Sequence, residues 1–124
     1  MGWRGDRPGE TVPHVLPLVV IDVRECIDAT GGNPYAVWFD SLSAPAAAKV
    51  AIAVTRMAQG NLSNVKSVGS GVLEYRIDFG PGYRIYLGKD GDRLVILLGG
   101  GSKKRQQQDI AAAIARWKEY KRRK

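Results

Sequence analysis

The segment from Leu73 to Leu87, which reads LEYRIDFGPGYRIYL, constrains the fold more than any other part of the chain. Apolar and polar residues alternate on both sides of a Gly-Pro-Gly turn, and this alternation is typical of a half-buried β-hairpin. With Gly80 to Gly82 as a three-residue loop, the apolar face is built from the pairs Phe79–Tyr83, Ile77–Ile85 and Tyr75–Leu87. The opposite face then carries the polar side chains Glu74, Arg76, Asp78, Arg84 and Tyr86.

Two short helices are predicted before this hairpin, after a first strand at 18–23. Asn33-Pro34 and Ser43-Ala44-Pro45 have the residues that begin helices, and Gly60-Asn61 can end the second one. Apolar residues recur at helical spacing after each start: Tyr35, Trp38, Phe39 and Leu42 in the first helix, and Ala47, Val50, Val54 and Met57 in the second. Because little chain separates them, the two should form a tight helical hairpin.

The remaining segments predict a loop, a further strand and a last helix. The segment 62–71 is polar and contains glycine, as loops do, and Asp90-Gly91 predicts a tight turn. The strand at 93–98 is apolar on both faces and should be central, with the glycines at 99–101 ending it. The helix should run from about Arg105 to Tyr120, with Ile110, Ile114 and Trp117 facing inward and a basic end at 118–124.

The resulting order, β-α-α-β-β-β-α, predicts an α+β domain with a largely antiparallel sheet and the helical hairpin packed on one face, so that the helices lie mainly on one side. A length of 124 residues suits one hydrophobic core. Residues 1–17 are rich in glycine and proline and are predicted to be a flexible tail, which leaves 18–124 as the domain.

The net charge of +7 and the isoelectric point near 9.8 favour a polyanionic partner, either a nucleic acid or an acidic protein. The alternative is a basic surface that serves solubility. Cys26 fits a reducing compartment, and a catalytic thiol is disfavoured because the one histidine, His14, lies in the tail.

Several other functional classes are excluded on sequence grounds. One cysteine and one histidine cannot make a structural zinc site, and the glycine-containing segments 69–71 and 99–102 lack the full nucleotide-binding patterns. No apolar run approaches the roughly 20 residues that span a bilayer. We therefore expect a cytoplasmic protein with no metal, no cofactor and no membrane partner.

The polar face of the hairpin is the first candidate site. Glu74 and Arg76 share one face of a strand, and Arg84 lies across the turn on the same face. RNA cleavage needs a base for the 2′-hydroxyl proton and cations for the phosphorane, and arginine binds phosphate oxygens in pairs. The alternative is an exposed, salt-bridged sheet face without chemistry, in which Asp78 lies opposite Arg84.

A second candidate site is the basic run of Lys103, Lys104 and Arg105, which precedes the last helix. The start of a helix offers free N–H groups and the positive end of a dipole to an anion, and the three cations would strengthen this attraction. The alternative is a run of solvated charges.

Beyond its predicted tail, the chain resembles the toxins of type II toxin–antitoxin modules. The resemblance is to the RelE/ParE superfamily, in its HigB-like branch of addiction module killer proteins, which includes phage-related members. It covers about residues 18–120 and rests on Gly60-Asn61, Lys66, the E-x-R of Glu74 and Arg76, GPGYRIY at 80–86, Lys103 and the Q-x-x-D-I-x-x-A at 106–113.

The resemblance implies a small RelE-like α+β toxin that cleaves mRNA in the ribosomal A site, without a metal, by attack of the 2′-hydroxyl. Glu74 would be the general base, Arg76 and Arg84 would stabilise the transition state, and Lys66 and Lys103 would contact phosphate or support the leaving group. A cognate antitoxin would neutralise the toxin. That partner should be acidic at its contact surface and carry a helix-turn-helix domain, so that operator DNA is reached only through it.

The general acid is the part of this mechanism that the sequence does not supply. Several ribonucleases of the superfamily place a C-terminal tyrosine or histidine near the scissile phosphate, whereas this chain has Gln108 and Ile110 in that region. Tyr86, Lys103 and the ribosome are the remaining options. Two other functions stay open: a gyrase inhibitor of the ParE type, and a non-catalytic nucleic-acid-binding regulator with the same fold.

Overall fold

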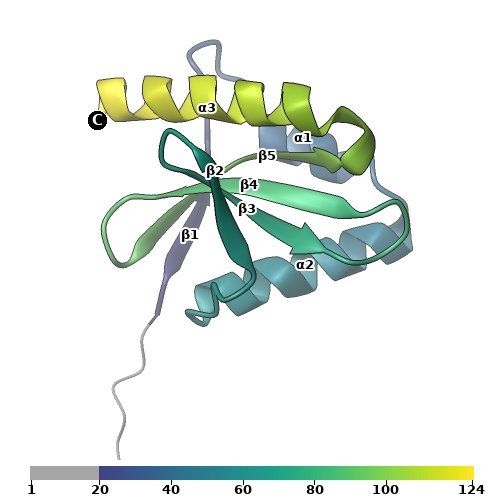
Figure 1. Ribbon diagram of the computed structural model, residues 1–124. Coiled ribbons are helices and arrows are strands. Elements are labelled where there is room, and N and C mark those ends of the chain that lie inside the picture. Colours follow the sequence, from purple (N-terminus) through teal and green to yellow (C-terminus); the bar gives the residue numbers. More distant parts are fainter. Residues whose placement is uncertain (1–19) are drawn as a thin grey trace, which may run out of the picture.

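The computed structural model of the protein describes residues 20–124. The predicted tail at 1–17 and the first two residues of the predicted first strand lie outside the described residues. The elements, drawn in Figure 1, are β1 (Asp22–Glu25), α1 (Pro34–Asp40), α2 (Ala44–Ala58), β2 (Val65–Gly69), β3 (Val72–Ile77), β4 (Tyr83–Lys89), β5 (Leu94–Ser102), a 3-10 turn (Lys103–Arg105) and α3 (Gln106–Arg123).

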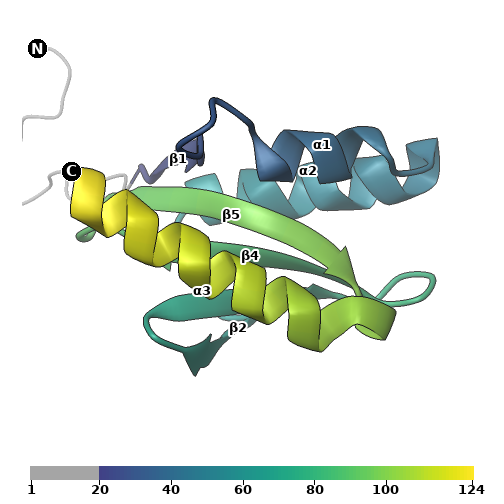
Figure 2. The same ribbon diagram turned by 90° about the horizontal axis from the view of Figure 1, so that it is seen from above.

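The strands form a five-stranded sheet in the order β1-β5-β4-β3-β2. β1 pairs parallel with β5, and the other neighbours pair antiparallel. The α+β class and the largely antiparallel sheet are therefore confirmed. Figure 2 shows α1 and α2 on one side of the sheet and α3 on the other.

The sheet has a hydrophobic core on each face, and this explains why the helices do not all lie on one side. The first core joins α1 and α2 to the sheet through Tyr35, Val50, Met57, Tyr75, Ile85, Leu87, Val95 and Leu97. The second lies under α3 and includes Cys26, Val72, Tyr86, Ile96, Leu98, Ala113 and Trp117. Because β4 and β5 are buried on both faces, the second face also needs a cover, and α3 provides it.

The helical hairpin forms as its sequence signals predict. The Asn33 side chain accepts a hydrogen bond from the Ala36 N–H at 2.9 Å, and the Ser43 hydroxyl accepts one from the Ala46 N–H at 3.3 Å. Each helix has proline in its first turn, where a missing N–H costs no hydrogen bond. These caps fix where α1 and α2 begin.

The hairpin of β3 and β4 is confirmed, but its predicted register is wrong by two residues. The observed pairs on the apolar face are Ile77–Tyr83, Tyr75–Ile85 and Leu73–Leu87. The loop spans 78–82, because Gly80 and Gly82 adopt positive φ angles of 56° and 82° and turn the chain outside the ladder. A shift of two keeps every side chain on its predicted face, but it places Arg76, not Asp78, opposite Arg84.

A further strand occupies part of the predicted loop at 62–71, so the observed order is β-α-α-β-β-β-β-α. β2 pairs antiparallel with β3, and Lys66 lies opposite Glu74. The strand is at the edge of the sheet and mostly exposed, which explains why it lacks the apolar pattern that sequence reasoning needs. Ser70 and Gly71, with φ angles of 53° and 85°, make the tight turn into β3.

The glycines at 99–101 were predicted to end β5, but the strand continues to Ser102. They are needed for close contact on both faces: a Cβ on Gly100 would overlap the Trp38 ring of α1, and one on Gly101 would overlap the Asp109 carboxylate of α3. A bulge between the pairs Tyr86–Gly99 and Leu87–Leu97 accompanies this change, and Gly99 has a φ of 153°.

The last helix extends beyond its predicted end, to Arg123. Its C-terminal turns are held by polar contacts: the Tyr120 hydroxyl donates to the Asp90 carboxylate at 2.7 Å, and Lys124 forms an ion pair with the same carboxylate at 2.6 Å. These contacts come from the turn before β5 and cannot be read from the helix itself.

Gly88→Ala is expected to lower the free energy of unfolding by about 1–3 kcal/mol, as overpacking in a core does. The added Cβ would lie 2.6 Å from ring atoms of Trp117, which is 4% exposed and stacks on Tyr120. Urea unfolding followed by circular dichroism measures the loss. The exposed neighbour Lys89→Ala is the control, with an expected change below about 0.5 kcal/mol. Equal stability of the two variants would contradict this packing.

Candidate functional site

The site is centred on Glu74, in the middle of β3 on the face that α3 covers. The Glu74 side chain is 0% exposed. Its Oε2 accepts a hydrogen bond from the Tyr86 hydroxyl at 3.1 Å and another from Nε2 of Gln106 at 2.9 Å. Two cations lie close by: Arg84 Nε is 3.6 Å from Oε2, and Lys66 Nζ is 3.9 Å from Oε1.

The sheet register assembles this cluster. Lys66 of β2, Glu74 of β3 and Tyr86 of β4 are direct neighbours across three strands, so their side chains share one face. On the same face, Arg76 and Arg84 form the next cross-strand pair toward the hairpin loop. Gln106 reaches the same carboxylate from the first residue of α3. Four elements of structure therefore place polar side chains around one buried carboxylate.

Burial determines the electrostatics of this cluster. The pKa of Tyr86 is raised well above its ordinary value, first by burial and then by the neighbouring Glu74 carboxylate. The phenol therefore stays protonated and donates to Glu74. Within the described structure, Oε1 of Glu74 and Nε of Arg84 are buried without a hydrogen-bond partner. Such atoms are costly in a folded protein, and each calls for an explanation, such as a catalytic role or a bound ion or water.

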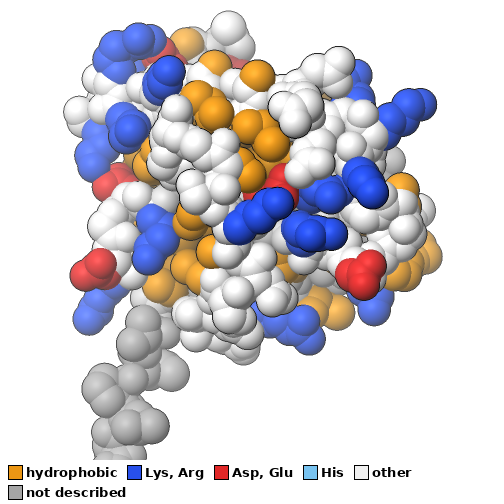
Figure 3. Space-filling view, viewed as in Figure 1, with side chains coloured by type: hydrophobic (Ala, Val, Ile, Leu, Met, Phe, Trp, Pro, Cys, Tyr) orange, Lys and Arg blue, Asp and Glu red, His pale blue; other side chains and the backbone are white. Residues whose placement is uncertain are grey.

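The alternative interpretation of the hairpin, an exposed polar sheet face, is therefore only half correct. Glu74 and Tyr86 are fully buried and Arg84 is 5% exposed, whereas Lys66 and Arg76 are exposed. Beside them, a pocket of about 420 Å³ is lined by Asn64, Arg76, Ile77, Asp78, Gly82, Tyr83 and Arg84. On the side of the molecule that Figure 3 views, Lys and Arg side chains gather near the centre, below α3.

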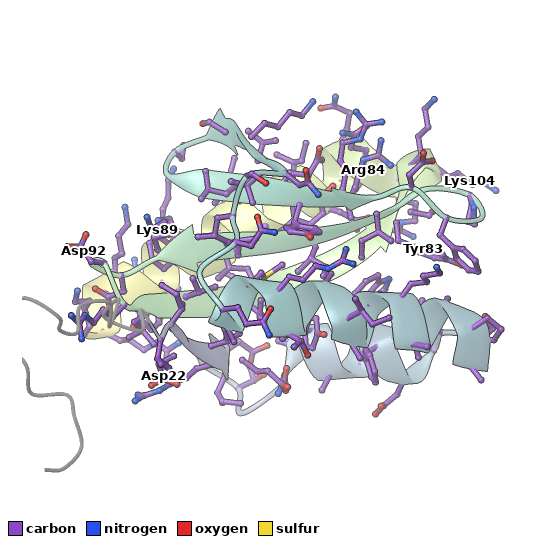
Figure 4. All side chains as sticks on the ribbon, turned by 90° about the horizontal axis from the view of Figure 1, so that it is seen from below. Asp22, Tyr83, Arg84, Lys89, Asp92 and Lys104 are labelled. Atoms are coloured by element: carbon purple, nitrogen blue, oxygen red, sulfur yellow. The ribbon has the colours of Figure 1, made fainter. Side chains whose placement is uncertain are left out.

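The predicted anion site at the start of the last helix lies at the same end of the molecule. Lys103, Lys104 and Arg105 form an exposed 3-10 turn, and the Lys103 N–H donates to the Gly82 carbonyl of the hairpin loop at 3.0 Å. In Figure 4, Lys104 lies near Arg84 and Tyr83, at the end opposite Asp22, Lys89 and Asp92. The first turn of α3 has no side-chain cap, but the Gln106 N–H already donates to the Lys103 carbonyl of the 3-10 turn, so an anion here would be bound mainly by the three basic side chains.

The structure therefore brings the predicted site residues together at one end of the sheet, except that Asp78 leaves the sheet face and lines the pocket. Sequence reasoning missed the role of Gln106, which binds Glu74 across 32 positions of the chain. The Q-x-x-D-I motif includes Gln106 but does not say what it touches. Asn64 is a further pocket residue that no sequence signal singled out, and Tyr83 was predicted only as part of the apolar face of the hairpin.

Cys26 is buried and free. Burial raises the pKa of its thiol, which disfavours the reactive thiolate. Among residues 20–124, no three His, Cys, Asp or Glu side chains are grouped so that they could hold a metal ion. In the same range, no helix combines the length and the apolar character needed to cross a membrane.

A comparison with known protein families gives no match to a family model. The chain is 44% identical over 68 residues to an uncharacterized protein of Haemophilus influenzae, and the match covers 55% of this chain and 69% of that protein. The chain belongs to the same family as this Haemophilus protein. Because that relative is uncharacterized, the shared family assigns no activity to the site.

Proposed function

We propose that the protein is the toxin of a type II toxin–antitoxin system of the RelE/ParE kind, a ribosome-dependent endoribonuclease that cleaves mRNA and inhibits translation. The observation that carries this proposal is the group of Lys66, Arg76 and Arg84 around the buried Glu74, beside a pocket of about 420 Å³. Directly opposed like charges such as Arg76 and Arg84 destabilise a sheet. An anion placed between them would remove that cost.

In this proposal Arg76 and Arg84 bind the scissile phosphate and stabilise the charge that develops on it. The three cations at 103–105, at the same end of the sheet, bind neighbouring phosphates of the same strand. The net charge of +7 attracts the RNA before these contacts form.

Glu74 takes the proton of the attacking 2′-hydroxyl in the proposed reaction. Its carboxylate is 0% exposed, so the Gln106 amide and the Lys66 side chain must move aside when RNA binds. Lys66 is exposed and free to do so. The Tyr86 hydroxyl donates a hydrogen bond to the carboxylate. Because this side chain is buried and already bonded to Glu74, it cannot reach a leaving group. The general acid is then Lys103 or a group of the ribosome.

The proposed partners are mRNA on the ribosome and a cognate antitoxin with an acidic contact surface and a helix-turn-helix domain. The protein would act in the cytoplasm, and it would reach operator DNA only through the antitoxin. No cofactor is part of the proposed reaction.

The test is to add the purified protein to translating ribosomes and map the mRNA ends. Discrete cuts in the A-site codon are expected, together with growth arrest when the protein is expressed without its antitoxin. Arg93→Ala, which removes an exposed cation before β5, is the matched control and should cut normally. Intact mRNA with gyrase-linked DNA breaks would instead indicate a ParE-type inhibitor. Intact mRNA with neither gyrase-linked breaks nor growth arrest would indicate a non-catalytic regulator. The burial of the Glu74 carboxylate would suit such a regulator.

A further inference from the structure

A second pocket lies between α1, the hairpin loop and the end of β5, and the proposed reaction does not use it. Its volume is about 440 Å³. The aromatic rings of Trp38 and Tyr83 line it, with Gly100 and Gly101 of β5, and Arg105 and Asp109 are at its polar side. The two ring centroids are 6.4 Å apart, and the planes are inclined by 59°.

The aromatic rings of this pocket are held in place but remain half exposed. Trp38 rests directly on Gly100, where any side chain would collide with the indole, and its ring also packs against Tyr35 at 5.9 Å between centroids. Tyr83 extends from the first residue of β4 beside the loop. Fixed, partly exposed aromatic rings are the usual platforms on which proteins stack bases of single-stranded nucleic acids.

The aromatic pocket adjoins the proposed phosphate site. Tyr83 lines both pockets, and its neighbour Arg84 lines the first. On the other side, Arg105 belongs to the basic turn and also lines the aromatic pocket. Cations that suit phosphates therefore flank rings that suit a base, which is the alternation that a single strand of RNA presents.

We propose that this pocket binds one nucleobase of a single-stranded RNA, the nucleotide next to the phosphate held by Arg76 and Arg84. This inference rests on the proposed function, because it assumes the RNA substrate and adds a binding site for one of its bases. The base packs against both Tyr83 and Trp38, whose rings line the pocket together. The Asp109 carboxylate, which lines the same pocket, accepts a hydrogen bond from an amino or ring N–H group of the base.

The charge of the pocket favours RNA over a peptide as its occupant. An apolar peptide side chain would fill the pocket equally well, but it would bring no phosphate to Arg105 or to the neighbouring Arg84. A nucleotide supplies the aromatic ring and the phosphate together. Burial raises the pKa of the Asp109 carboxyl, with Arg105 and Arg116 acting in the opposite direction.

The test compares labelled 2′-O-methyl RNA tetramers, which lack the attacking hydroxyl, with an abasic tetramer of the same charge. Fluorescence anisotropy at low salt measures the dissociation constants. The unchanged protein should bind at least one of the base-containing tetramers about 5- to 100-fold more tightly than the abasic one, as expected for stacking of one base. Tyr83→Leu and Trp38→Leu should each remove most of this difference. Tyr120→Leu, which replaces a half-buried tyrosine at the far end of α3, should retain it.

Equal binding of base-containing and abasic tetramers by the unchanged protein would overturn the base pocket, as would a preference that survives in Tyr83→Leu. The comparison in the unchanged protein stands even if Trp38→Leu fails to fold. The two proposals fail separately: intact mRNA on ribosomes with a retained base preference rejects the ribonuclease only, and normal cleavage without base preference rejects the pocket only.

Discussion

Glu74→Ala is expected to lower the free energy of unfolding by about 3–5 kcal/mol, the cost of removing one partner from a buried ion pair. Arg84, 5% exposed, would lose the carboxylate that lies 3.6 Å from its Nε. Tyr86 and Gln106 would lose their common acceptor. For a domain whose total stability is about 5–15 kcal/mol, this loss is a large fraction of the total.

A double-mutant cycle tests whether this cost comes from the ion pair. Glu74→Leu and Arg84→Met, measured alone and together by urea unfolding, should be non-additive by about 0.5–3 kcal/mol, with the double variant less destabilised than the sum. Lys66→Ala is the control for the exposed partner of the same carboxylate, and it should change stability by less than about 1 kcal/mol. Additive losses would mean that Glu74 and Arg84 act independently.

Glu74→Gln separates the chemical role of the carboxylate from its role in the fold. Glutamine keeps the shape and one oxygen acceptor for Tyr86 but cannot take a proton. If Glu74 is the general base, cleavage on ribosomes should fall by about 10²–10⁴-fold while the variant remains folded by circular dichroism. A folded Glu74→Gln protein that cleaves normally would leave Glu74 as a positioning residue for Arg84.

The sequence was sufficient to predict the parts of the fold that depend on local pattern. Alternation defined both strands of the β3–β4 hairpin, and caps at Asn33 and Ser43 defined both helix starts. The register of the hairpin was not predictable, because Gly80 and Gly82 allow both a three-residue and a five-residue loop. β2 was missed because an exposed edge strand shows no periodicity, and its pairing with β3 is a tertiary contact.

The candidate site was predictable by residue type and face, but not by burial. Glu74, Arg76 and Arg84 share a face in any register of the hairpin that keeps the alternation. Whether this face meets solvent depends on α3, and the sequence did not say which side α3 would cover. The burial of Glu74 under Gln106 follows from that choice. The aromatic pocket depends in turn on Gly100 and Gly101, which were interpreted as the end of a strand rather than as contact points for α1 and α3.

Arg76→Ala is expected to lower cleavage by about 10²–10³-fold, the usual cost of removing one donor to the charge of a transition state. The same change should leave the free energy of unfolding unchanged or slightly higher. Arg76 is exposed and directly opposite Arg84, so its removal relieves a like-charge pair without opening a cavity. Ribosome cleavage assays and urea unfolding of the same preparation measure the two effects together.

The combination of lost activity with retained stability distinguishes a functional Arg76 from a structural one. A residue kept for the fold should lower stability when it is removed, whereas a residue kept for a ligand commonly costs stability in the absence of that ligand.

The salt dependence of RNA binding gives an independent measure: if Arg76 contacts a phosphate, its loss should reduce the slope of log affinity against log salt by about 0.7 for a single strand. Arg93→Ala removes an equal charge away from the site and should leave both cleavage and slope unchanged. If Arg76→Ala instead destabilises the protein and leaves the slope unchanged, then Arg76 supports the sheet, and the phosphate site must rest on Arg84 and the basic turn alone.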